Sequence, residues 1–240
     1  MVRPEGKSLA LSLRNIYETF AISFPTVVDA MRHRVTKEVC DARLARWAGR
    51  VVEHAAIDLH VFGSENLAPG ETYLVMSNHQ SLYDIPVLFR TIGANIRMIA
   101  KRELFQVPIF GGALAAAGFI AIDRRDRNAA IRSLDRARAL LAGGTHVWIA
   151  PEGTRSLTGK LLPFKKGAFY LAFEAGLPIL PVTLSGTRDA LPAKGLRSSV
   201  GARVRATIHP RIDPRPYAER GRPGRQVLMD EVRRVLESAL

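Results

Sequence analysis

The chain has 240 residues, of which 47% are hydrophobic and 24% are charged, as expected for a globular protein with a sizeable core. It contains a single cysteine, Cys40, which excludes an internal disulfide and indicates a reducing compartment. The net charge of +13 favours anionic partners such as nucleic acid, an anionic membrane surface or phosphorylated substrates.

The sequence shows no pattern typical of a metal site or of a membrane-spanning helix. Its six histidines are scattered, and none has a cysteine partner at zinc-site spacing. The most apolar N-terminal run, Phe20 to Val28, is about half as long as a bilayer-spanning helix and contains Pro25. We therefore expect no metal, no signal peptide, and a protein that is soluble or bound to a surface.

Residues 1–56 are predicted to be helical, without a strand. Apolar residues recur at three- and four-residue spacing between Val27 and Val52, and arginines and lysines lie among them. Pro25 is expected to separate this helix from an earlier one over Leu9 to Phe24, which gives a helical pair. Two interpretations of the apolar face stay open: it packs on the rest of the protein, or part of it rests in a membrane interface.

From about residue 57 the chain alternates short apolar strands with helices. The predicted strands are 57–62, 73–77, 96–100, 119–122, 146–150, 179–184 and 203–209. Helices are predicted over 127–144, 165–176 and 226–239, and a loop or loosely packed arm over 210–225. Such alternation predicts an α/β fold with a mixed, largely parallel central sheet flanked by helices. We therefore divide the chain into an N-terminal helical pair (1–56) and an α/β domain (57–240).

The stretch SNHQSLYD (77–84) places an ionisable pair directly after a predicted strand. His79 and Asp84 are five residues apart, so they would not share a face of one regular helix. A turn that carries His79, followed by a helix with Asp84 at its start, would let the carboxylate reach the imidazole. Alternatively, Ser81 and Asp84 form a helix-capping box with Asp in place of the usual Glu or Gln. The two interpretations are compatible with each other.

Two further polar clusters follow predicted strands, at the places where open α/β sheets bind ligands. Lys101 and Arg124 each follow a strand, with an apolar helix of small residues between them. In PEGTRS (151–156), Gly153 is free to take a positive φ, and Arg155 offers planar donors to a phosphate. Ordinary packing explains each cluster as well: solvated charges beside a core helix, or a surface turn with a salt-bridged arginine.

Four blocks taken together resemble the glycerolipid acyltransferase family, in particular the bacterial 1-acyl-sn-glycerol-3-phosphate acyltransferases. The blocks are NHQSLYD, KRELFQVPIFGGALAAAGFIAIDR, PEGTRS and LPILPVTL, in that order, and they extend from about Tyr73 to Thr187. Each block alone is moderately specific, whereas four in sequence are a strong signal. The chain departs from the family pattern at Ala150, where an aromatic residue is usual, and nothing after Thr187 matches a family block.

The resemblance implies transfer of a fatty acyl group from acyl-CoA or acyl carrier protein to the sn-2 hydroxyl of lysophosphatidic acid, giving phosphatidic acid. His79 would remove the hydroxyl proton and Asp84 would orient the imidazole, without an acyl-enzyme. The positions expected at the acceptor phosphate are Lys101, Arg124, Glu152, Gly153, Thr154 and Arg155. Apart from the acyl donor, no cofactor is expected. The segment Phe105 to Phe119 is expected to form one wall of an acyl groove.

The resemblance also implies a peripheral or monotopic enzyme on the cytoplasmic face of the inner membrane, with the N-terminal helices as its docking element. Three alternatives stay open: an acyltransferase for another lysolipid such as lyso-ornithine lipid, a basic nucleic-acid-binding protein, and a hydrolase that uses Ser77 or Ser81. The chain has neither an RNP-like nor a zinc-finger pattern, so nucleic acid is not expected as a partner. It also lacks the G-x-S-x-G elbow of many serine hydrolases.

Overall fold

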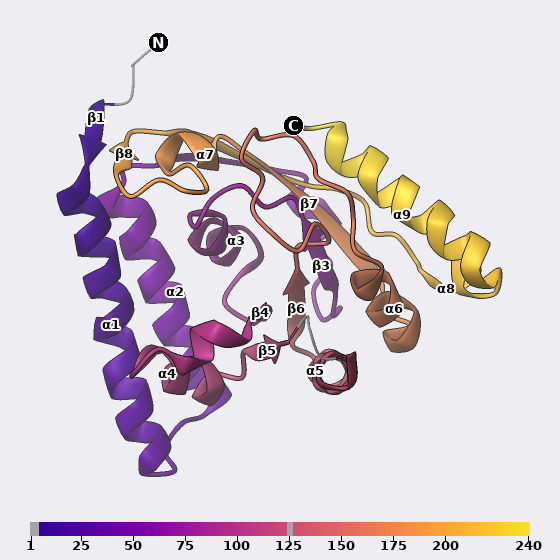
Figure 1. Ribbon diagram of the computed structural model, residues 1–240, viewed down its shortest axis with the longest axis horizontal. Helices are drawn as coiled ribbons and strands as arrows, with labels where there is room; N and C mark the ends of the chain where they lie inside the picture. The colour runs from indigo at the N-terminus through magenta and orange to yellow at the C-terminus, as the bar shows by residue number, and fades with distance from the viewer. Residues whose placement is uncertain (1–4, 124–126) are drawn as a thin grey trace.

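Seven strands of the described chain form one sheet, with helices packed on both of its faces (Figure 1). The computed structural model describes residues 5–123 and 127–240. The strand order is β2-β9-β7-β3-β6-β4-β5, and neighbouring strands are parallel except for the antiparallel pair β7 and β9. The bounds are β2 Asp58–Phe62, β3 Leu74–Ser77, β4 Ile96–Lys101, β5 Ile120–Ile122, β6 His146–Ile149, β7 Ile179–Ser185 and β9 Arg203–Ile208. This confirms the predicted mixed, largely parallel sheet and all seven predicted strands.

The helices divide between the two faces of the sheet. The longer ones are α1 Leu9–Met31, α2 Lys37–His54, α3 Asp84–Ile92, α4 Phe110–Ala116, α5 Arg127–Ala142, α6 Lys166–Ala175 and α9 Gly221–Glu237. The short ones are η1 Ser64–Asn66, η2 Arg102–Gln106, α7 Thr187–Ala190 and α8 Arg215–Ala218. Leu74 and Met76 of β3 belong to a core cluster with α5, α6 and α9, whereas Val75 belongs to a cluster with α2 and α3. Because β3 is buried on both faces, its sequence is a continuous apolar run.

The first two helices form a pair at one end of the molecule (Figure 1). The predicted break at Pro25 is wrong, because α1 continues through this residue to Met31. A proline inside a helix costs about 3 kcal/mol, and here the packing of α1 against both α2 and α4 offsets that cost. The chain reverses instead between Met31 and Lys37, where His33 takes a φ of 53°.

Strands β1 (Glu5–Ser8) and β8 (Ser198–Val200) and helix α8 were not predicted from the sequence, and α9 begins earlier than predicted. Strand β1 pairs antiparallel with β8, so the prediction of a strand-free N-terminal region is wrong. Helices α8 and α9 both begin within the stretch predicted as a loop, 210–225. Pro223 lies in the first turn of α9, where its missing N–H leaves no helical hydrogen bond unmade.

No helix in the described part of the chain combines the length and the apolar character needed to cross a bilayer.

Candidate active site

The predicted site residues gather at the edge of the sheet where the parallel strands end. The turn that carries His79 follows β3, and the loop that carries Glu152 follows the neighbouring strand β6. Lys101 is the last residue of β4, which lies beside β6. On the other side of β3, strand β7 leads into α7 at Thr187. Four chain segments that are distant in sequence therefore meet at one edge, where open α/β sheets bind their ligands.

His79 and Asp84 are in direct contact. The Nδ1 atom of His79 lies 2.6 Å from Oδ2 of Asp84, and the Asp84 side chain is fully buried. The same Oδ2 atom accepts the backbone N–H groups of Gln80 at 2.7 Å and Ser81 at 2.9 Å. The Ser81 hydroxyl accepts the N–H of Tyr83 and donates to the carbonyl of Leu191. Asp84 thus binds both the imidazole and the turn backbone. Only one half of the predicted capping box forms, the bond from the Ser81 N–H to Asp84, because the N-cap of α3 is Tyr83 and the Ser81 hydroxyl accepts the Tyr83 N–H.

The imidazole of His79 is fixed on one side and accessible on the other. The edge of the Trp148 ring system packs against it, with ring centroids 5.4 Å apart and planes at 88°. The indole N–H of Trp148 donates to the Ser77 hydroxyl at 2.8 Å, which holds the ring in place. With Nδ1 donating to the Asp84 carboxylate, Nε2 is the nitrogen that can accept a proton. The His79 side chain keeps 17% of its surface exposed, so a substrate hydroxyl can reach it.

Glu152 holds the backbone of His79 rather than its ring. One carboxylate oxygen accepts the His79 N–H at 2.8 Å, and the other accepts the Leu162 N–H at 2.7 Å. The N–H of Ser156 donates to the His79 carbonyl at 2.7 Å, so the loop after β6 contacts this residue at two points. Burial raises the pKa of Glu152, although these backbone bonds act in the opposite direction. Both oxygens are committed to the backbone, which favours a loop-orienting role over contact with a phosphate.

The remaining predicted phosphate-binding residues lie on neighbouring segments. Gly153 has a φ of 72°, the positive value expected of it, and Thr154 is exposed beside it. The side chains of Lys101 and Arg155 form no hydrogen bond or ion pair with any residue the structure describes, so both cations can serve an external anion. Arg124 lies outside the described residues. The roles of all these residues in phosphate binding stay predictions.

The sequence did not predict two sets of hydrogen bonds in the site. The side-chain amides of Asn78 and Gln80 bind the backbone of Leu184 in β7, with all three hydrogen bonds between 2.7 and 2.8 Å long. The hydroxyl of Thr187 donates to Oδ1 of Asp84 at 2.5 Å. A signal for Thr187 was present, because Ser185-Gly186-Thr187 is also a polar segment that directly follows a predicted apolar strand.

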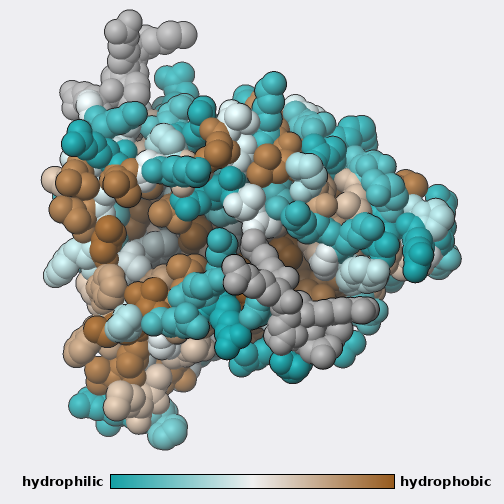
Figure 2. All heavy atoms as spheres, in the orientation of Figure 1, coloured by the Kyte–Doolittle hydropathy of each residue, from teal (hydrophilic) through white to brown (hydrophobic). Residues whose placement is uncertain are grey.

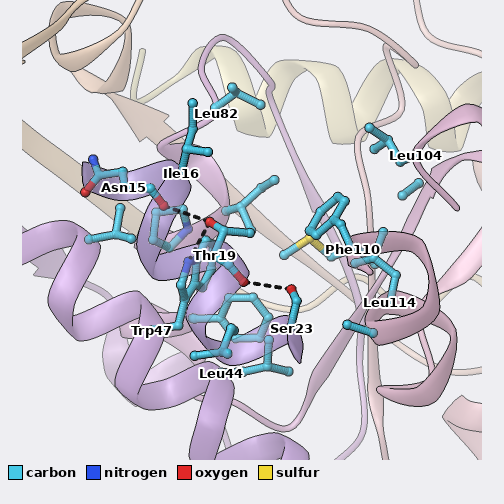
Figure 3. Close-up of a pocket in the computed structure, with 18 of the residues that line it drawn as sticks. Asn15, Ile16, Thr19, Ser23, Leu44, Trp47, Leu82, Leu104, Phe110 and Leu114 are labelled. Atoms are coloured by element: carbon cyan, nitrogen blue, oxygen red, sulfur yellow. Dashed lines mark hydrogen bonds between the residues drawn. The ribbon is translucent and has the colours of Figure 1, made fainter. Parts of the chain in front are cut away.

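A mostly apolar cavity of about 470 Å³ lies beside the His79 turn, between the N-terminal helices and α4 (Figure 3). Leu82 and Tyr83, which come directly before Asp84, line it. One wall comes from α1 and α2, including Trp47, and the opposite wall from Phe110 and Leu114 of α4. The segment expected to form one wall of an acyl groove, 105–119, therefore does line a cavity.

The described residues contain no group of three or more His, Cys, Asp or Glu side chains arranged to hold a metal ion.

Comparison with known proteins agrees with this geometry. The acyltransferase family model matches residues 58–185, which include β3, the His79 turn, the Glu152 loop and all of β7. The chain belongs to the acyltransferase family. A 1-acyl-sn-glycerol-3-phosphate acyltransferase of Chlamydomonas reinhardtii is 35% identical over 75% of this chain and 52% of the relative. For the alpha form of the mouse enzyme of that name, the identity is 37% over 65% of this chain and 55% of the relative.

These curated relatives are longer proteins, and the chain spans about half of their length. A solved structure covers the chain more fully. The 1-acyl-sn-glycerophosphate acyltransferase PlsC of Thermotoga maritima superposes on 95% of this chain and 96% of its own, with a TM-score of 0.70 and 27% identity. The likeness extends beyond the family-model region, so this member of the acyltransferase family shares the overall architecture of PlsC.

Proposed function

We propose that this acyltransferase-family chain transfers a fatty acyl group from a thioester donor to the sn-2 hydroxyl of 1-acyl-sn-glycerol-3-phosphate, giving phosphatidic acid. The observation that carries the proposal is the His79–Asp84 pair at the strand ends, 2.6 Å apart. The relatives and the Thermotoga maritima protein described above are named for this acceptor, which supports it here.

In the proposed reaction His79 is the general base. The acceptor hydroxyl oxygen attacks the thioester carbonyl carbon while its proton passes to Nε2 of His79, and a C–O bond forms. Collapse of the tetrahedral intermediate breaks the C–S bond, and the departing thiolate takes the proton from His79. Asp84 stabilises the imidazolium between these steps, and a base of this kind typically contributes about 10²–10⁴-fold to the rate. Since the substrate alcohol is the nucleophile, no bond to the protein forms.

The free cations at the strand ends are the proposed site for the acceptor phosphate. Arg155 can bind two phosphate oxygens at once through its planar guanidinium, whereas Lys101 contributes a point charge. Thr154 lies next to Arg155 and can add a hydroxyl donor. The N–H of Gly153 already donates to the Ala150 carbonyl at 3.0 Å, so Gly153 is proposed to contribute through its turn conformation. Arg124 is proposed for the same site on the resemblance alone. The proposed acceptor is therefore held by its phosphate while its hydroxyl faces His79.

The cavity beside the catalytic turn is the proposed site of an acyl chain. Its volume of about 470 Å³ lies within the ordinary range for small-molecule sites, and its lining is mostly apolar. Because Leu82 and Tyr83 belong to both the cavity and the His79–Asp84 turn, a chain in the cavity would place its carboxyl end near His79. Acyl-CoA and acyl carrier protein are both proposed as donors, since both carry the thioester and both are anionic.

The outer face of α1 is the proposed membrane-docking surface. The helix directs polar groups inward, where Asn15 donates to the Tyr83 hydroxyl and Thr19 accepts the Trp47 N–H. Its outward face is apolar (Figure 2), and the exposed side chains on it are Leu9, Leu13, Ile16, Tyr17, Phe20, Phe24 and Met31. A helix with this arrangement is suited to lie in a lipid interface. The proposed surface is the cytoplasmic face of the cell membrane, where both thioester donors are found.

The decisive experiment is transfer of labelled acyl groups from both donors to a panel of lysolipids, with His79→Ala as the test variant. We expect transfer to 1-acyl-sn-glycerol-3-phosphate and a rate at least about 100-fold lower in His79→Ala. His60→Ala, a change on the exposed edge strand β2, is the matched control and should keep the wild-type rate.

Three other outcomes would each overturn one part of the proposal: the role of His79, the acceptor, or the direct attack. A near-normal rate in His79→Ala would remove the histidine from the mechanism. Preference for lyso-ornithine lipid, which lacks the phosphate, would replace the acceptor but keep the acyl transfer. Detection of a stable acyl-serine by mass spectrometry would replace direct attack with a covalent intermediate.

A further inference from the structure

Asp84 is a carboxylate with both oxygens bonded and no exposure to solvent. Its Oδ2 atom accepts three hydrogen bonds, from the His79 ring and from two backbone N–H groups. Its Oδ1 atom accepts one hydrogen bond, from the hydroxyl of Thr187 at 2.5 Å. Thr187 is likewise fully buried. A buried carboxylate stays ionised only when hydrogen bonds replace its lost hydration, so each of these donors affects its proton affinity.

The position of Thr187 is fixed by the backbone on which it stands. Gly186 precedes it with a φ of 89°, and a Cβ atom there would lie 2.0 Å from the carbonyl oxygen of Arg203, so only glycine fits. Two residues before that glycine, the Leu184 carbonyl accepts bonds from the side chains of Asn78 and Gln80 on the His79 turn. The end of β7 and the catalytic turn therefore form one hydrogen-bonded unit, which delivers the Thr187 hydroxyl to Asp84.

We propose that Thr187 is a positioning residue for the His79–Asp84 base, which it tunes through Oδ1, the carboxylate oxygen that does not contact His79. This inference rests on the proposed function, because it concerns the base of that reaction. Thr187 contacts neither His79 nor the proposed phosphate site through any described hydrogen bond. Thr187 acts on the reaction only through Asp84. It changes how tightly the His79–Asp84 pair binds a proton, and it leaves substrate binding unchanged.

The sign of the effect follows from the hydrogen bond. Removal of the hydroxyl leaves the negative charge on Oδ1 without its donor, so the carboxylate becomes more basic. Whether the proton then resides on His79 or on Asp84, the pair as a whole binds it more tightly. The acid limb of the kcat/KM profile must therefore move to higher pH. On that limb the variant loses activity because less of the base is free of its proton.

The other charged groups around the His79–Asp84 pair are unchanged when Thr187 is replaced. Glu152 contacts His79 from the loop after β6. Arg155 stands in the same loop, half-buried, while Arg188 and Asp189 of α7 are exposed. Since none of these groups is altered, a difference between wild type and a Thr187 variant reports on the hydroxyl.

The test is the pH dependence of acyl transfer in Thr187→Val and Thr187→Ser. Valine keeps the shape but removes the hydroxyl, and serine restores it. For Thr187→Val we expect the acid limb to move up by about one pH unit, so that kcat/KM on this limb falls about tenfold, with the acceptor KM unchanged. Thr187→Ser should return both values close to wild type.

Thr183→Val is the matched control, because it removes a buried hydroxyl from β7, four residues before Thr187. Thr183 donates to the Leu236 carbonyl of α9, on the side away from the site, and its hydroxyl also lies 2.9 Å from His209. Thermal melts should show a similar loss of stability in both valine variants, whereas only Thr187→Val should move the acid limb. If Thr187→Val does not fold, Thr187→Ala is measured with the same expectation.

An unchanged acid limb in Thr187→Val would overturn the inference, as would an equal movement in Thr183→Val. Either result leaves the proposed function standing, provided that the wild type transfers acyl groups and His79→Ala does not. Failure of the wild type to acylate any lysolipid refutes the proposed function instead, so the two failures are distinguishable.

Discussion

At the scale of single residues, two carboxylates hold one histidine from different sides. Asp84 binds the imidazole ring, and Glu152 binds the backbone N–H of the same residue. The ring and the backbone of His79 are therefore positioned by separate segments, α3 and the loop after β6. This arrangement limits the freedom of the imidazole without covering Nε2, as pre-organised general-base catalysis requires.

The ionisation of Glu152 is expected to make the free energy of unfolding depend on pH. Burial raises the pKa of Glu152 above its ordinary value of 4.5. The Glu152 carboxyl therefore binds its proton more readily in the folded protein than in the unfolded chain. As the pH rises from about 4.5 through the raised pKa, ionisation of Glu152 lowers the free energy of unfolding. Glu152→Gln removes this contribution. The free energy of unfolding of wild type minus that of the variant should therefore decrease between about pH 4 and pH 7.

Urea denaturation across that pH range measures the difference directly. Glu174→Gln, on the exposed surface of α6, gives the baseline for loss of a carboxylate elsewhere. A difference that instead grows with pH would mean that the bonds to His79 and Leu162 outweigh the burial of Glu152.

At the scale of elements, the strands that the sequence predicts with the least ambiguity are those buried on both faces. Strands such as β3 and β7 are continuous apolar runs, which leaves little ambiguity about their position. The strands β1 and β8 were missed because they are short and mostly polar, and a polar pair of three or four residues has no periodicity. The break wrongly placed at Pro25 has a different origin, since packing against α2 and α4 overrides a local preference.

The same distinction applies to the site. His79 and Asp84 lie five residues apart in sequence, so a local pattern was enough to suggest their contact. The contact of Thr187 with Asp84 spans 103 residues and depends on which strands are neighbours, which the sequence did not reveal. The phosphate-binding roles of Lys101, Gly153, Thr154 and Arg155 stay predictions, because sheet topology brings their segments to one edge but no ligand contact is described.

Helix α9 supports the Glu152 loop from outside. Its Arg233 donates to the Leu162 carbonyl at 2.5 Å and stacks over the Phe164 ring, 4.6 Å from the ring centroid. The N–H of the same Leu162 donates to Glu152, whose other oxygen binds His79. A continuous set of contacts thus leads from the last helix to the backbone of His79.

Arg233→Met is expected to loosen this loop, because methionine keeps an apolar stem but cannot donate to Leu162. Amide hydrogen exchange at Leu162 and its neighbours should become about tenfold faster, which corresponds to the loss of roughly one charged hydrogen bond. Arg225→Met is the control, since Arg225 stacks on Tyr170 from the same helix without a described bond to the loop. Equal exchange rates in the two variants would show that α9 does not support the loop through Arg233.

At the scale of the whole molecule, the proposed docking face lies on the outer side of α1, and the cavity and the His79 turn lie on its inner side. The outer side of α1 is apolar, and residues on its inner side line the cavity. Asn15 then contacts Tyr83, one residue before Asp84. An acyl chain in the cavity would therefore lie between the proposed lipid surface and the His79 turn. Helix α9 lies at the opposite end of the molecule (Figure 1).

Charge on the outer face of α1 should abolish docking without disturbing the chemistry. Leu13, Tyr17 and Phe24 are 57%, 68% and 60% exposed and do not line the cavity, so their replacement by glutamate leaves the core intact. An apolar side chain buried in lipid contributes about 1.5–3 kcal/mol, so the triple variant should bind vesicles at least about 100-fold more weakly.

Flotation with vesicles that contain anionic lipid measures this loss, while transfer to a dispersed short-chain lysolipid should continue at the wild-type rate. Phe62→Glu/Val227→Glu, which places two carboxylates on exposed apolar positions of β2 and α9, should float normally. Normal flotation of the α1 variant would instead assign membrane contact to another surface, because a face that carries three carboxylates cannot rest in an apolar and anionic interface.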